Sequence, residues 1–219
     1  MLKIIKECKD PSILVLTPLS PNRKISSQTK TSIQRNNISY VWASWESPHY
    51  HARNVQDGIN AYKKKYGLPN YIQVLDDDII LNRHTLDRFY HVIFESPDNV
   101  AFVYCPFSYR GHINISFPAI EYDINRLMRG NWISSNSLYK TSAIEKVGGF
   151  VVEDDTQRLS DWAMWFRLYK YGYIGQLCAN TSFVAVSSPK DLSSGSIEEY
   201  KRAEALVRER YINPIREKM

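Results

Sequence analysis

Three consecutive carboxylates, Asp76, Asp77 and Asp78, interrupt the apolar stretch YIQVLDDDIIL at residues 71–81. Because side chains alternate along an extended chain, we expect Asp76 and Asp78 on one side and Asp77 on the other. Two convergent carboxylates form a hard-oxygen site that suits Mg²⁺ or Mn²⁺, which complete their shells with water and substrate phosphate. The alternative is a solvated acidic turn before the next helix, because short acidic motifs often occur without a ligand.

Alternating strands and helices surround the three acids. In the first half of the sequence, strands are predicted at 12–16, 38–44, 71–75 and 99–107, and helices at 26–37, 52–67 and 84–96. This alternation predicts an α/β fold with a mostly parallel central sheet flanked by helices. In open α/β sheets, ligands bind outside the carboxyl ends of the strands, and the acids lie at such an end.

The second half of the sequence is less regular. It contains a mixed segment at 131–150, a Trp-rich helix at 161–172, a strand at 182–188 and an amphipathic helix at 196–211. Because no repeat or linker is visible, residues 1–219 are expected to form one domain. Its parts are a regular half at about 12–110, a less regular half at about 111–190 and a helical extension at about 191–219.

Composition limits the class of protein. Lys and Arg number 28 against 23 Asp and Glu, which gives a mildly basic net charge of +5. The three scattered cysteines, Cys8, Cys105 and Cys178, match no zinc spacing or disulfide framework and predict a reducing compartment. The first residues contain no apolar run long enough for a signal peptide or a membrane span. We therefore expect a soluble cytoplasmic protein without a membrane span.

Five short segments follow one another along roughly residues 12–175: ILVLTPLSPNR, HARNVQDGINA, VLDDDIIL, SLYKTSAIEKVGGF and SDWAMWFRLYKYGY. They contain a Pro turn after a strand, an Ala-Arg-Asn helix start, an Asp-x-Asp strand end, a Gly-Gly-Phe end and an acidic start of a Trp-rich helix. In this order they resemble the family 2 glycosyltransferases, which have the GT-A fold. The joint order is more specific than any single segment.

The resemblance implies that about 12–110 is a nucleotide-binding half with a donor site for a nucleotide-sugar, and that about 111–190 is the acceptor and catalytic half. Thr17 and Pro18 in the first turn, Arg53 in the Ala-Arg-Asn segment, and Asp76 and Asp77 correspond to donor-binding positions. Arg53 would supply a fixed positive charge near the nucleotide, although an exposed helix arginine is commoner on residue type alone.

The resemblance also implies a metal ion, Mn²⁺ or Mg²⁺. Asp78 would bind the ion that bridges the donor diphosphate, and Asp76 would share it or hold the ribose. A cation there stabilises the negative charge that develops on a diphosphate leaving group.

Asp161 begins the Trp-rich helix. Trp162, Trp165, Phe166 and Tyr169 have the spacing of a buried helical stripe. Ser160 is predicted to be the N-cap, which places Asp161 in the first turn, where the helix dipole favours a carboxylate. That structural role is by itself a sufficient reason for an acid at this position, without any catalysis. By resemblance, Asp161 has the position of the catalytic base in an inverting direct displacement.

The sequence departs from the family pattern in three places. VWASWESPHY replaces the usual Asp-Asp-Gly-Ser after the second strand and leaves only Glu46 as an acid. The segment between this strand and HARN is short, so we expect the usual third strand to be shrunken or missing, and Ser160 replaces a common Glu. Because of the first departure, the sequence does not indicate which nucleotide base the donor carries. The Gln-x-x-Arg-Trp motif of processive members and their membrane helices are absent from the sequence, which favours transfer of one sugar over polysaccharide synthesis.

Two other classes of function remain open at this stage. The basic runs at 62–67 and 200–211 could bind nucleic acid, and a DNA-directed glycosyltransferase would combine both ideas. Such runs are more often solvated helix faces. The other class is a binding module for nucleotide-sugars without catalysis. The acceptor is unassigned and could be a glycan, a small molecule or modified DNA.

Overall fold

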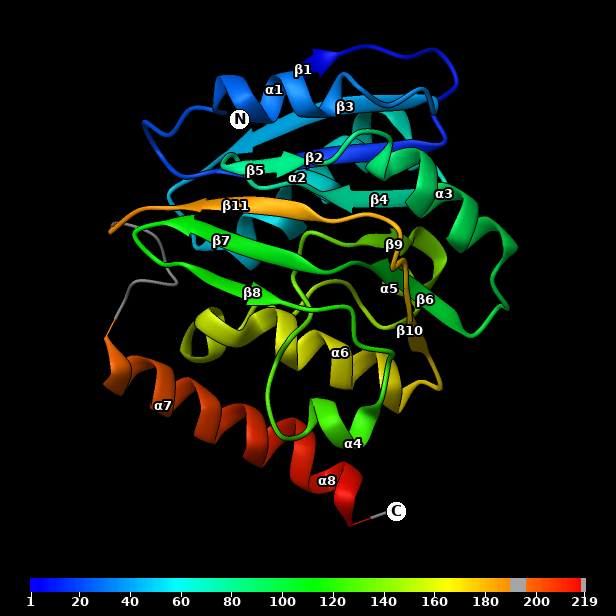
Figure 1. Cartoon of the computed structure of the whole chain (residues 1–219). Helices are drawn as coiled ribbons and strands as arrows, with labels where there is room; N and C mark the ends of the chain where they lie inside the picture. The colour runs from blue at the N-terminus through cyan, green and yellow to red at the C-terminus, as the bar shows by residue number, and fades with distance from the viewer. Residues whose placement is uncertain (190–195, 218–219) are drawn as a thin grey trace.

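A seven-stranded sheet forms the centre of the part of the protein that the computed structural model describes, residues 1–189 and 196–217 (Figure 1). In spatial order its strands are β1 (Leu2–Lys6), β3 (Tyr40–Glu46), β2 (Ile13–Leu19), β4 (Tyr71–Val74), β9 (Leu138–Lys140), β6 (Val100–Tyr104) and β10 (Ile174–Leu177). Strands β2, β3, β4, β6 and β10 run in one direction, and β1 and β9 run against their neighbours. The sheet is therefore mostly parallel, as predicted.

A second sheet begins directly after the three acids. Its strands, in spatial order, are β5 (Ile79–Leu81), β11 (Phe183–Ser187), β7 (Phe107–Gly111) and β8 (Ile115–Phe117). Strand β5 starts one residue after Asp78, so the acidic turn connects the central sheet to the second sheet. Both sheets can therefore contribute side chains around the acids.

Helices cover both faces of the central sheet. Leu14 and Leu16 face the core formed with α2 (His51–Tyr66), α5 (Thr141–Lys146) and α6 (Ser160–Lys170). Ile13 and Val15 face the other core, which is formed with α1 (Ser27–Ile33), α3 (Thr85–Glu95) and the second sheet. Burial on both faces explains why β2 is apolar without interruption before Thr17.

The C-terminal helices pack beneath α6 in the view of Figure 1. They are α7 (Ile197–Val207), a π-helical turn (Arg208–Ile212) and α8 (Asn213–Arg216). Arg210 joins them to the 3₁₀ helix η1 (Asp154–Leu159) by an ion pair of 2.6 Å with Asp155. The short helix α4 (Ile124–Leu127) lies on the same side of the molecule. Residues 191–195 and 218–219 of the predicted extension lie outside the described residues.

The sequence predicts the long elements correctly, including α1, for which the structure has Ser26 as the N-cap. The predicted N-cap of α6 is wrong, because Leu159 occupies that position and Ser160 is already helical. Strands β1, β5, β7, β8, β9 and β10 were not predicted, because they are short or have no clear alternation. Among the described residues, no helix is long and apolar enough to cross a membrane.

Candidate active site

A cleft of about 580 Å³ lies at the carboxyl ends of β2 and β4. All three acids of the triplet line it, and so does Asp161 at the start of α6. Further walls come from the segment after β2, the start of α2, the second sheet, the segment before β9, η1 and α7. The fold thus brings the triplet and Asp161 into one cleft, although Asp78 and Asp161 are 83 residues apart in the sequence.

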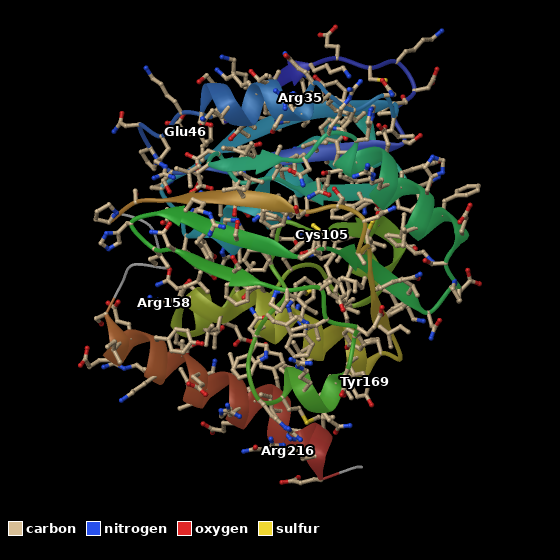
Figure 2. All side chains as sticks on the ribbon, viewed as in Figure 1. Arg35, Glu46, Cys105, Arg158, Tyr169 and Arg216 are labelled. Carbon is tan, nitrogen blue, oxygen red and sulfur yellow. The ribbon has the colours of Figure 1, made fainter. Side chains whose placement is uncertain are left out.

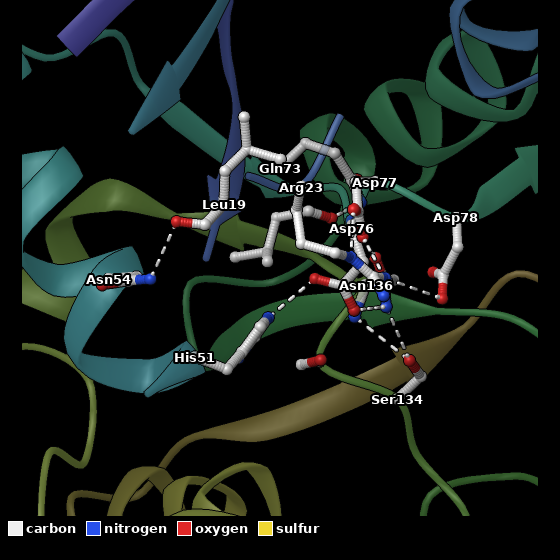
Figure 3. A network of polar contacts seen from close by, with 12 residues as sticks. Leu19, Arg23, His51, Asn54, Gln73, Asp76, Asp77, Asp78, Ser134 and Asn136 are labelled. Carbon is white, nitrogen blue, oxygen red and sulfur yellow. Dashed lines mark hydrogen bonds and ion pairs between the residues drawn. The ribbon is translucent and has the colours of Figure 1, made fainter. Parts of the chain in front are cut away.

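Asp76 is held by two neighbouring side chains (Figure 3). Nε2 of His51, the first residue of α2, lies 2.7 Å from Oδ1 of Asp76. Nδ2 of Asn136 donates to Oδ2 over 2.8 Å, and the backbone N–H of Asp76 donates to Oδ1 of Asn136 over 2.8 Å. These contacts fix the orientation of the carboxylate and satisfy both of its oxygens.

The pKa values of His51 and Asp76 move apart. Burial lowers the pKa of His51, but the charge and hydrogen bond of Asp76 outweigh burial, and the net shift is upward. Burial raises the pKa of Asp76, but His51 and Asn136 outweigh it, and the net shift is downward. The two side chains therefore form an ion pair of imidazolium and carboxylate at the base of the cleft.

Arg23 neutralises part of the remaining acidic charge. Its guanidinium donates from Nε and Nη2 to the two carboxylate oxygens of Asp77, over 2.8 and 2.9 Å. Nη2 also lies 3.9 Å from Oδ2 of Asp78. Ser26 and Thr29 bind the backbone carbonyl of Asp77, so the start of α1 holds the acidic turn in place.

The predicted alternation of the three acids is wrong. Strand β4 ends at Val74, and Asp77 and Asp78 lie in a turn, so the two-residue period of an extended chain does not extend through the triplet. Asp77 and Asp78 share Arg23, whereas Asp76 turns toward His51 and Asn136. All three nevertheless line the same cleft.

Asp161 lies in the first turn of α6, as predicted. Its Oδ1 accepts a hydrogen bond from the backbone N–H of Trp162 over 2.7 Å. Its Oδ2 accepts a hydrogen bond from Nδ2 of Asn131 over 3.0 Å. Burial raises the pKa of Asp161 to about 6, against the opposing effect of these hydrogen bonds. A buried carboxylate with a pKa near neutrality is suited to accept a proton in a reaction.

The other predicted donor-binding residues differ in their exposure to the cleft. Pro18 lines it. Thr17 is fully buried and does not line the cleft. Its hydroxyl accepts a hydrogen bond from Nε1 of Trp42 over 3.0 Å, which stabilises the end of β2 within the core. Arg53 is not among the cleft residues, and its guanidinium lies 3.4 Å from the carbonyl oxygen of Val152. Contact of Thr17 or Arg53 with a nucleotide stays a prediction.

Among the polar residues of the site, Arg23, His51, Asn131 and Asn136 were not singled out from the sequence. His51 directly precedes the Ala-Arg-Asn segment, and Asn131 and Asn136 bracket WISS in the mixed segment. Arg23 and His51 lie within the segments ILVLTPLSPNR and HARNVQDGINA, and that was the available signal for them. Their pairing with particular acids depends on contacts over 25 to 60 positions, which a local pattern does not contain.

A metal ion bound at this site would need oxygen atoms from a substrate. In residues 1–189 and 196–217, no group of three or more His, Cys, Asp or Glu side chains is arranged to hold a metal ion. The carboxylates present still fit Mg²⁺ or Mn²⁺ in chemistry, since both ions prefer oxygen ligands and usually retain water or phosphate oxygens. Asp78 borders the cleft and is about one quarter exposed.

Solved structures share this arrangement of strands and helices. S. aureus TarS superposes with a TM-score of 0.59 and 13% identity, over 90% of this chain and 39% of TarS. The TarS 1-349 complex with UDP-GlcNAc gives a TM-score of 0.60 and 12% identity, over 91% of this chain and 67% of that one. The fold is that of the GT-A glycosyltransferases.

A smaller protein has the same fold. A197 from STIV superposes with a TM-score of 0.53 and 11% identity, over 80% of this chain and 86% of its own. No protein-family model matches the sequence, and no curated protein matches it. Because this chain spans only 39% of the TarS chain and because identity is low, these likenesses establish the fold and leave activity to the site.

Proposed function

We propose that the protein is a metal-dependent glycosyltransferase that moves one sugar from a nucleotide-sugar to an acceptor hydroxyl. The observation that carries the proposal is the cleft itself, in which an acidic turn at a strand end faces a buried carboxylate of raised pKa. One side of such a cleft suits a diphosphate leaving group and the other suits removal of a proton. The GT-A fold supports the same interpretation.

The charge of the cleft explains why a cation is part of the proposal. Four carboxylates line it, against the guanidinium groups of Arg23 and Arg158 and the imidazolium of His51. These cations already face carboxylates at 2.8, 3.4 and 2.7 Å. A diphosphate would be repelled unless a further cation joined it to the acids. TarS 1-349 binds UDP and UDP-GlcNAc, so uridine nucleotides are the first donors to test.

We assign the metal contact to Asp78, with the donor phosphates supplying further oxygens. Both oxygens of Asp76 already accept hydrogen bonds, from His51 and Asn136, so Asp76 is the weaker candidate and orients the donor instead. When bound, Mg²⁺ or Mn²⁺ would supply positive charge to the departing diphosphate. The Arg23 guanidinium adds a second positive charge on the same side of the cleft.

Asp161 is proposed as the general base. As the acceptor oxygen bonds to the anomeric carbon, Asp161 accepts the hydroxyl proton, and the bond from that carbon to the nucleoside diphosphate breaks with its electron pair. Asn131 and the N–H of Trp162 hold the carboxylate in place during this step. A direct displacement of this kind inverts the anomeric configuration.

The pKa of Asp161 leads to a prediction about pH. Because the base must be ionised, kcat/KM should rise tenfold for each pH unit below about 6 and become level above it. The measurement is the rate of nucleoside diphosphate release between pH 5 and 8, with saturating Mn²⁺. A rate that is constant over this range would exclude Asp161 as the titrating base.

Donor binding can be tested without knowledge of the acceptor. A ligand that binds only the folded protein raises its melting temperature by mass action. We expect at least one nucleotide-sugar from a panel of uridine, guanosine, adenosine, cytidine and thymidine diphosphosugars to raise it in the presence of Mn²⁺, and to raise it much less with EDTA. A panel without any shift in either condition would contradict the proposal.

The structure weakens one argument for nucleic-acid binding. Within the basic run at 200–211, Arg208 pairs with Glu204 over 2.7 Å and Arg210 pairs with Asp155 over 2.6 Å. Lys63 in the other run pairs with Glu145 over 2.6 Å. These cations contact acids of the same chain, which makes them less available to bind phosphates.

A further inference from the structure

The cleft extends beyond the residues assigned to the donor and to the base. Tyr109 and Phe117 of the second sheet line it, and so does Tyr200 of α7. We call these three residues the aromatic rim. In Figure 1, α6 lies between strand β8 and helix α7, so the rim residues come from elements on both sides of the helix that carries Asp161.

The rim residues of the second sheet are held by a rigid aromatic cluster. Phe107 stacks on Phe117 with ring centroids 4.5 Å apart and on Phe183 with centroids 5.1 Å apart. Tyr109 packs edge-on against Phe107 at 5.7 Å. Phe107 and Phe183 are buried, whereas Tyr109 and Phe117 are half-buried and border the cleft. Two aromatic side chains are therefore presented to the cleft in fixed positions.

Tyr200 is positioned from the opposite side by the attachment of α7 to η1. A capping box of Ser196 and Glu199 begins α7, and Arg158 of η1 donates to the carbonyl oxygen of Ser196 over 2.7 Å. Arg158 also pairs with Glu199 over 3.4 Å. Figure 2 shows Arg158 between the second sheet and α7. Tyr200 is itself 42% exposed, so part of its ring is accessible to a ligand.

Tyr200 lies within the electrostatic influence of the proposed base. Burial raises the pKa of Tyr200, and the carboxylates of Glu204 and Asp161 raise it further. Because Tyr200 and Asp161 line the same cleft, a molecule in contact with the rim can place a hydroxyl at Asp161, where an acceptor hydroxyl must lie.

The charge of the cleft favours an uncharged molecule. Besides Asp161, the three acids of the triplet line the same space, and Arg158 is paired with Glu199. A nucleic acid would have to bring its phosphates close to these carboxylates. A neutral sugar has no such repulsion, and the C–H groups on its ring face pack well on aromatic rings.

We propose that Tyr109, Phe117 and Tyr200 form the subsite for a neutral carbohydrate acceptor, packed between the second sheet and α7 with one hydroxyl directed at Asp161. This inference rests on the proposed function and names the acceptor class for it. Tyr200 acts by binding the acceptor and takes no part in the proton transfer.

The test uses the full chain and neutral disaccharides as probes: cellobiose, maltose, lactose, xylobiose and N,N′-diacetylchitobiose. Saturation-transfer NMR with Mg²⁺ and UDP should detect at least one of them. We expect Tyr200→Ala to weaken its binding by about tenfold, the upper range for one aromatic contact. Tyr200→Phe should bind nearly as wild type does. Tyr171→Ala is the matched control, because Tyr171 is 48% exposed and does not line the cleft.

The outcomes separate this inference from the proposed function. If nucleotide-sugars bind but none of the disaccharides does, or if Tyr200→Ala binds them as wild type does, the subsite is overturned while the donor site stands. If disaccharides bind through Tyr200 and no nucleotide-sugar binds, the subsite stands and the proposed function fails. Binding of a short DNA duplex that displaces the disaccharide would also overturn the choice of a neutral acceptor.

Discussion

Asp161→Asn should bind nucleotide-sugar and Mn²⁺ nearly as well as the wild-type protein and lose sugar transfer by roughly 10²-fold or more. The amide keeps the size of the carboxylate and an oxygen that can accept from the N–H of Trp162. It cannot take a proton from an acceptor hydroxyl at neutral pH. Calorimetric titration of the donor, together with the rate of nucleoside diphosphate release, measures the two properties separately.

The same variant has an expected effect on stability. Because the pKa of Asp161 is raised to about 6 in the folded protein, the proton it holds stabilises the fold fully below the unfolded value near 3.8. That stabilisation is lost as pH rises through about 6. Asp161→Asn should therefore melt at the same temperature as wild type or higher at pH 7 to 8. A purely structural helix-start acid would instead lose stability on substitution.

The matched control is Asp155→Asn. Asp155 lies in η1, pairs with Arg210 over 2.6 Å and does not line the cleft. Its substitution should leave transfer unchanged. If Asp161→Asn turned over at a rate close to wild type, Asp161 would be a structural acid only.

The second large effect is expected at Asp78. Asp78→Asn should weaken Mn²⁺-dependent binding of a nucleoside diphosphate by at least the roughly 10- to 100-fold that loss of an outer-shell partner costs at a metal site. The reason is the loss of the carboxylate that we assign to the ion. The measurement is calorimetric titration of UDP with and without Mn²⁺.

Asp77→Asn is the comparison for Asp78. The Asp77 carboxylate is held through both oxygens by Arg23, so its loss removes an ion pair and releases the guanidinium without removing the proposed metal ligand. We expect the Mn²⁺-dependent part of binding to fall much less than in Asp78→Asn. Equal losses in the two variants would show that the metal assignment is wrong.

The architecture was readable from the sequence because it depends on local patterns. Uninterrupted apolar strands such as β2 and amphipathic helices such as α2 have strong periodic signals, and their order predicts a parallel sheet. The acidic triplet could also be recognised as a local pattern, because it interrupts an apolar stretch. The short strands of the second sheet carry no comparable signal, since β5 and β8 have three residues each.

The partners of the acids could not be predicted in the same way. Asp76 meets His51 and Asn136 only because α2 and the segment before β9 converge on the end of β4. The predicted alternation, which placed Asp77 and Asp78 on opposite sides, is wrong because β4 ends at Val74. Beyond that residue the chain turns, so the two-residue period of a strand no longer applies. The position of Tyr200 at the cleft could not be predicted either, because it depends on where α7 packs.

The most direct measurement is the release of nucleoside diphosphate from a panel of nucleotide-sugars, with Mn²⁺ and a mixture of neutral glycans. We predict release from at least one donor by the wild-type protein, suppression by EDTA, and loss in both Asp78→Asn and Asp161→Asn. Binding of a donor without release from any member of the panel would contradict the account and would indicate a nucleotide-sugar-binding module without catalysis.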